Sequence, residues 1–130
     1  MTIKFKPIKS TVEVIIESEH LEEPCVLTLK KPSHIDVRFE YPKMQLKLQE
    51  KLKESGLTTE DFSNNELTLK KIELLEVILK NQIEIVKLVA VNVSNNDIES
   101  FVSFGLIPQI VEKYNLVIAE EVKFEAEKKS

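Results

Sequence analysis

The apolar residues near the start of the chain alternate with polar ones, as they do in β-strands. Residues 11–17 carry valine or isoleucine at every second position from residue 12, which is the period of a half-buried strand. A second extended run covers residues 25–30, and the polar connection between the two runs ends at Pro24. This pattern predicts an antiparallel β-hairpin with a longer loop. Ile3 and Phe5 are candidates for a third strand.

The next stretch, residues 33–41, supports two interpretations. Its apolar residues alternate as in a strand, whereas Pro32, Ser33 and Asp36 resemble the start of a capped helix. Pro42 complicates either choice, so strand and helix both stay open at this point.

After Pro42 the apolar residues follow helical spacing. Met44, Leu48 and Leu52 recur every four residues between lysines and glutamates, which predicts a helix over residues 43–54 that Gly56 closes. A short helical turn is expected next, at Thr58 or Thr59, because Glu60 and Asp61 suit the positive end of a helix.

The longest predicted helix covers residues 66–91 and is apolar on two sides. One stripe follows helical spacing and contains Leu67, Ile72, Leu75, Leu79, Val86 and Val89. A neighbouring stripe contains Leu74, Ile78, Ile85 and Leu88. A helix that is apolar on two faces needs two packing partners.

The last third of the chain predicts two more helices. Ser94 with Asp97 is a capping pair for a short amphipathic helix that ends at Gly105, and Pro108 is well placed to start another. Asn115 is a point where that last helix could stop, in which case residues 116–119 would form a strand.

These elements predict an α+β fold, mainly helical, with an N-terminal antiparallel β-hairpin. We expect a single domain over residues 1–130, in which residues 1–32 form the hairpin region, residues 33–123 the helical region and residues 124–130 a frayed, charged tail.

Residue types suited to catalysis or metal binding are few. Only Gly56 and Gly105 are glycines, and phosphate-binding loops and nucleophile elbows depend on glycine. His20, Cys25 and His34 match no standard zinc spacing, and no local signature places a base beside the cysteine. We therefore expect no enzyme activity, no catalytic or metal site and no cofactor.

Net charge and hydropathy limit the partners further. A formal net charge of −4 disfavours broad electrostatic binding of nucleic acid. No apolar stretch reaches the length that spans a membrane, and the start of the chain lacks the apolar run of a signal peptide. Together with a lone cysteine, this indicates a cytoplasmic protein with neither nucleic acid nor membrane as its partner.

Candidate chemistry therefore reduces to apolar surface. The simpler interpretation of the two-sided helix is a central core helix, and the alternative is self-association, in which a second copy covers its second stripe. The candidate protein-interaction residues are Leu74, Ile78, Ile85, Leu88, Phe101 and Phe104. On the second interpretation we expect a homo-oligomer.

The layout resembles that of the tail assembly chaperones of long-tailed bacteriophages and related prophages. The resemblance lies in residues 12–16, in the run from Val26 through Leu29-Lys30-Lys31-Pro32-Ser33, and in the mostly helical, acidic remainder. It implies a non-enzymatic chaperone that coats the tape measure protein, recruits tail tube subunits and often forms oligomers. Residues 35–41 depart from the pattern at the first helix.

The function expected from the sequence is therefore that of a protein-binding assembly factor. A small regulator or inhibitor of the antitoxin type, also acting by protein–protein binding, is the alternative.

Overall fold

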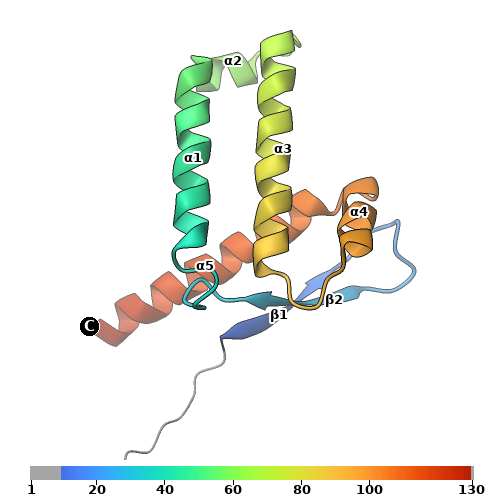
Figure 1. The fold of residues 1–130 in the computed structure, drawn as a ribbon, viewed down its shortest axis with the longest axis vertical. Helices are drawn as coiled ribbons and strands as arrows, with labels where there is room; N and C mark the ends of the chain where they lie inside the picture. Colours follow the sequence, from blue (N-terminus) through green and yellow to red (C-terminus); the bar gives the residue numbers. More distant parts are fainter. Residues whose placement is uncertain (1–9, 130) are drawn as a thin grey trace, which may run out of the picture.

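The computed structural model describes residues 10–129, and its fold is α+β and mainly helical, with an N-terminal hairpin, as predicted (Figure 1). The elements within those residues are β1 (Thr11–Ile16), β2 (Cys25–Lys30), α1 (Glu40–Ser55), α2 (Thr59–Ser63), α3 (Leu69–Val89), α4 (Asn95–Ser103) and α5 (Ile107–Lys129).

The two strands pair antiparallel, with Val14 opposite Leu27 and Ile16 opposite Cys25. Because side chains alternate across a sheet, one face is buried against the helices and the other is open. Ile15 and Val26 pair directly on the open face. The predicted hairpin is confirmed, whereas the predicted third strand at residues 3–5 lies outside the described residues.

Neither interpretation holds for residues 33–39, which form a series of turns, whereas Glu40 and Tyr41 already belong to α1. The His34 carbonyl accepts hydrogen bonds from the amides of Val37 and Arg38, and Val37 is fully buried. The apolar alternation therefore reflects one anchoring side chain in a turn. Pro42 lies in the first turn of α1, where a missing N–H breaks no helical hydrogen bond.

Helix ends follow the capping signals of the sequence. Gly56 closes α1 at a φ of 68°, in the left-handed region that glycine adopts without strain. Thr58 with Asp61 and Ser94 with Asp97 both form complete capping boxes. Thr68 caps α3, which consequently begins at Leu69, three residues later than predicted.

The last helix, α5, runs without interruption from Ile107 to Lys129. It passes through Asn115, so the alternative of a strand over residues 116–119 is wrong. It also includes residues 124–129.

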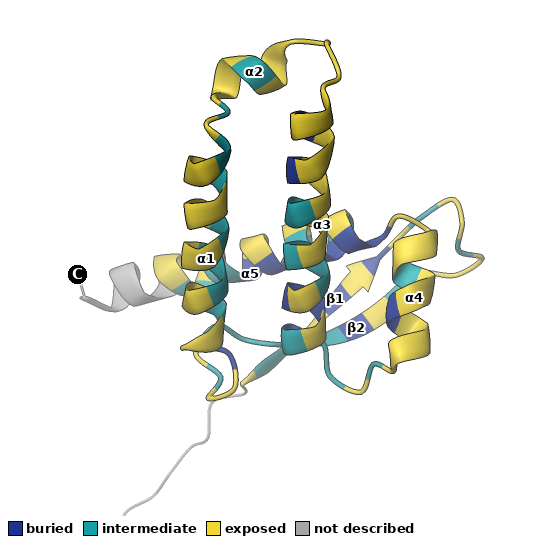
Figure 2. Cartoon of the chain, turned by 45° about the horizontal axis from the view of Figure 1, so that its top comes forward, coloured by how far each residue is buried: buried dark blue, intermediate teal, exposed yellow. Residues whose placement is uncertain are grey.

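The core lies where the hairpin, the C-terminal half of α3, α4 and α5 meet (Figure 2). Nine side chains are almost completely enclosed: Ile16, Leu29, Val37, Ile85, Val86, Val89, Ile107, Ile110 and Tyr114. The segment after α3 is tied to the sheet, because the Val91 amide donates to the Thr28 carbonyl at 2.9 Å and Ala90 forms a bridge with Leu29.

Tyr114 is the largest enclosed side chain, and its ring packs edge-on against Tyr41 at 5.5 Å. Its hydroxyl has no hydrogen-bond partner among the described residues. A buried polar group without a partner destabilises a fold. We therefore expect Tyr114→Phe to raise the free energy of unfolding by about 1 kcal/mol in urea titrations at pH 7.

The same substitution is expected to change the response to alkaline pH. Burial raises the pKa of Tyr114 above its ordinary value of 10.0, so the unfolded chain ionises first as the pH rises. The stability linked to the protonated phenol is complete below pH 10.0 and is lost as the pH rises above it. Tyr114→Phe should lose less stability than wild type between pH 9 and pH 11; an identical loss in both would contradict this assignment.

Candidate protein-binding surface

The helical hairpin of α1 and α3 projects from the core as an arm, with α2 across its far end (Figure 1). We define the arm as residues 40–84. Within it only Lys71 and Leu74 are buried, and α1 contributes no buried residue at all. Figure 2 shows exposed and half-buried residues along nearly the whole arm. The arm therefore has almost no core of its own, although it is rich in leucine.

The two long helices of the arm touch through one narrow stripe each. On α1 the half-buried residues include Met44, Leu48 and Leu52, whose four-residue spacing places them on one side of the helix. On α3, Leu74 is the buried apolar residue of the arm. The side-chain amide of Asn81 on α3 donates a hydrogen bond to the Met44 carbonyl of α1 at 3.4 Å. This contact leaves the other side of each helix without cover from its neighbour.

A shallow groove of about 290 Å³ lies between the two helices. It is lined by Met44, Lys47, Leu48, Lys51, Val77, Lys80, Asn81 and Glu84. Its apolar atoms belong to the contact between the helices, and its lysines are exposed. The groove is therefore part of the contact between α1 and α3. Its lining residues do not form a cluster of catalytic groups.

The far end of the arm is held in shape by hydrogen bonds. The buried Lys71 ammonium group donates to the carbonyls of Glu66 at 2.7 Å and Asn64 at 3.1 Å, so it closes the loop between α2 and α3. Next to it, the Thr58 amide donates to Asp61, and this hydrogen bond lowers the pKa of the Asp61 carboxyl group. The loop is thus ordered by polar contacts in place of an apolar core.

Large apolar side chains point outward from this ordered arm. Four of them lie on α3 at spacings of three and four residues, which place them along one side of the helix. We name this set the arm patch, and it comprises Leu69 (72% exposed), Ile72 (37%), Leu75 (50%) and Leu79 (39%). These fractions correspond to roughly 350 Å² of exposed surface, a size at which patches on single chains often serve binding.

The arm patch continues a stripe that is buried further along α3. Beyond Leu79, the same side of α3 carries Val86, which is fully buried in the core. One apolar stripe thus has a covered half near the core and an uncovered half on the arm. The uncovered half is the part that offers a binding surface.

The six residues proposed from sequence fall into three groups. Leu74 and Ile85 are buried and have no surface to offer a partner in this conformation. Ile78, Leu88 and Phe101 are half-buried. Phe104 is 45% exposed, but its ring stacks on His20 at 6.2 Å. The α3 stripe that was predicted to bind a partner, which runs from Leu74 to Leu88, therefore faces the protein's own core and α1. The exposed arm patch belongs to the other stripe of α3, from Leu67 to Val89.

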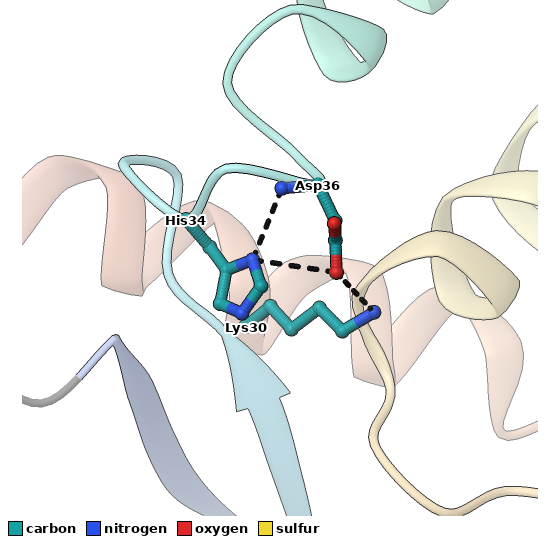
Figure 3. Close-up of polar contacts among 3 residues, drawn as sticks. All are labelled: Lys30, His34 and Asp36. Atoms are coloured by element: carbon teal, nitrogen blue, oxygen red, sulfur yellow. Dashed lines mark hydrogen bonds and ion pairs between the residues drawn. The ribbon is translucent and has the colours of Figure 1, made fainter.

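Polar side chains gather at the turn between β2 and α1 (Figure 3). The Lys30 ammonium group lies 3.3 Å from the Asp36 carboxylate, and His34 Nδ1 accepts a hydrogen bond from the Asp36 amide at 3.1 Å. Ser33 donates to Glu121 of α5 at 3.3 Å. Each contact closes or anchors the turn that buries Val37, so the cluster has a structural explanation.

The remaining candidates for catalysis or metal binding lie outside this turn. Cys25 is a half-buried free thiol at the start of β2. Within the described part of the chain, no three His, Cys, Asp or Glu residues are grouped so that they could hold a metal ion. None of the helices described here is long and apolar enough to cross a membrane.

Comparison with known proteins gives no match to a family model, to a curated protein or to a solved structure. The resemblance to phage tail assembly chaperones therefore stays a prediction.

Proposed function

We propose that this protein acts by binding other polypeptides through the arm patch, without catalysing a reaction. The observation that carries the proposal is the exposure of four large aliphatic side chains on α3, whose same apolar stripe is fully buried further along the helix, at Val86 and Val89. Covering such side chains removes apolar surface from water, which stabilises a complex by about 25 cal/mol per Å² before the entropic cost of association.

The order of the arm supports the same function. A surface that is already fixed loses little conformational entropy when a partner covers it. The capping box at Thr58, the Thr68 cap and the Lys71 contacts fix the loop from which α3 starts. The arm patch thus begins at a rigid point at the far end of the molecule.

In its more specific form, the proposal is an assembly factor of the kind that the sequence resembles. The arm would hold an apolar segment of an incompletely assembled protein, in the cytoplasm, until that segment reaches its final partner. The tape measure and tail tube proteins are the partners that the resemblance implies.

Co-purification from the native source tests the proposal. We expect Leu75→Glu to reduce the yield of bound partner by about tenfold, because a carboxylate would have to be desolvated at the centre of the patch. Leu46→Glu is the matched control: Leu46 is 61% exposed on α1, on the side away from the Met44, Leu48 and Leu52 stripe. Quantitative mass spectrometry of the co-purified proteins gives the ratio.

Equal partner yields from the two variants would contradict the proposal, provided that both keep the circular dichroism spectrum of wild type. The identity of the partner then decides the more specific form. A tape measure or tail tube protein supports the assembly factor, and a toxin supports the regulator.

A further inference from the structure

We infer that the groove between α1 and α3 is a second binding site on the arm, and that it holds an acidic amphipathic helix of a partner protein. The inference goes beyond the proposed function, because the groove and the arm patch lie on different sides of α3. Val77, Lys80, Asn81 and Glu84 line the groove at spacings of three and four residues. These residues form a helical series of their own, which is turned away from the arm patch.

The groove is basic although the chain is acidic. The whole chain has 18 lysines and arginines against 22 aspartates and glutamates, whereas the groove is lined by three lysines and one glutamate. That glutamate, Glu84, already lies 3.5 Å from Lys87. Lys47, Lys51 and Lys80 form no ion pair with any side chain that the structure describes. The groove therefore carries an excess of positive charge, which favours an acidic partner.

The spacing of the lysines favours a ligand with several carboxylates. Lys47 and Lys51 are four residues apart on α1, so they lie about 6 Å apart along the helix axis and repel each other. Lys80 stands across the groove on α3. A fatty acid would bring one carboxylate to these three lysines. A helix with acidic residues four apart repeats the spacing of the lysines and removes the repulsion between them.

Apolar side chains form the floor between the lysines. Met44, Leu48 and Val77 are half-buried, so each still presents apolar surface to the groove. Because the groove is shallow, an acyl chain in it would stay largely in water, whereas the apolar face of a helix would cover the floor from above. Nucleic acid offers phosphates but no such apolar face along its backbone. The combination of floor and charge therefore favours an amphipathic polypeptide.

Fluorescence anisotropy with a labelled synthetic peptide tests the inference. The probe is an amphipathic helix of about fifteen residues, with leucines on one face and glutamates four apart beside them. We expect it to bind the full chain at low salt with a dissociation constant on the order of tens of micromolar. Binding should weaken at least about tenfold at roughly 0.5 M salt, because salt screens the ion pairs. A peptide with glutamine in place of every glutamate should also bind at least about tenfold more weakly.

Two charge reversals locate the site on the arm. Lys51→Glu and Lys80→Glu should each raise the dissociation constant of the acidic peptide at least about tenfold, because each replaces an attraction by a repulsion. Lys53→Glu is the matched control, because Lys53 is exposed on the same helix as Lys51 but on the side away from the groove. It should leave the constant within about twofold of wild type. Circular dichroism confirms that each variant is folded.

No binding of the acidic peptide would overturn the inference, and so would binding that Lys51→Glu and Lys80→Glu leave unchanged. Equally tight binding of decanoate or of a single-stranded oligonucleotide would overturn it as well, because the groove would then accept anions of any kind. None of these results affects the proposed function, which is judged by the partner that co-purifies with wild type and with Leu75→Glu. Conversely, a peptide that binds through Lys51 and Lys80 supports the inference even if Leu75→Glu retains its partner.

Discussion

Replacing Ile16 by alanine is expected to lower the free energy of unfolding by about 2–5 kcal/mol, as for other buried isoleucines. Ile16 is completely buried at the end of β1, against the helices, so truncation would leave a cavity. Ile15 is the matched control, because it is the same residue type in the same strand but 53% exposed. Ile15→Ala should change the stability by less than about 1 kcal/mol in the same urea titration.

The difference between these neighbours measures whether the inner face of the hairpin belongs to the core. Similar losses for both variants would mean that the open face of the sheet is covered as well. Similarly small losses of stability for both variants would mean that the hairpin contributes little to the part of the protein that unfolds cooperatively.

Replacing Lys71 by methionine is expected to loosen the far end of the arm without unfolding the core. The apolar stem of the side chain is kept, but the carbonyls of Asn64 and Glu66 lose their charged donor. Such hydrogen bonds contribute about 1.5–3 kcal/mol, so amide hydrogen exchange in residues 64–70 should become at least about tenfold faster. Lys70→Met, beside it on the exposed side of the helix, should leave these rates nearly unchanged.

Equal exchange rates in the two lysine variants would show that the Lys71 contacts do not hold the loop. Faster exchange that spreads to α5 would show that arm and core unfold together. The expected result is a local change, because Lys71 lies outside the main apolar cluster.

Local signals predicted the helices and strands well. Alternation in residues 11–17 predicted β1, and residues at helix ends predicted the start of α4 at the Ser94 and Asp97 capping box and the end of α1 at the left-handed Gly56. The starts of α1 and α3 were each predicted three residues away from their positions at Glu40 and Leu69. These features act within a few residues of each other, so the sequence shows them directly. Local signals did not predict the structure of residues 33–39, because burial of Val37 depends on a turn that is anchored by contacts with β2 and α5.

Assigning the two stripes of α3 depends on tertiary packing, which periodicity does not contain. Both stripes have helical spacing, and the sequence does not show on which side α1 lies. One available signal was Gln82, a polar residue that separates Leu79 from Val86 on the first stripe. It marks the point where the covered part of that stripe gives way to the exposed arm patch.

Site-specific photo-cross-linking in the native cell tests directly whether another polypeptide covers the arm patch. A benzoylphenylalanine at position 75 places the reactive group in the arm patch, and the same residue at position 46 places it on the far side of the arm. We expect a discrete cross-linked polypeptide from position 75, either another protein or a second copy, at several times the yield from position 46. Equal yields from the two positions, or no adduct from position 75, would contradict it.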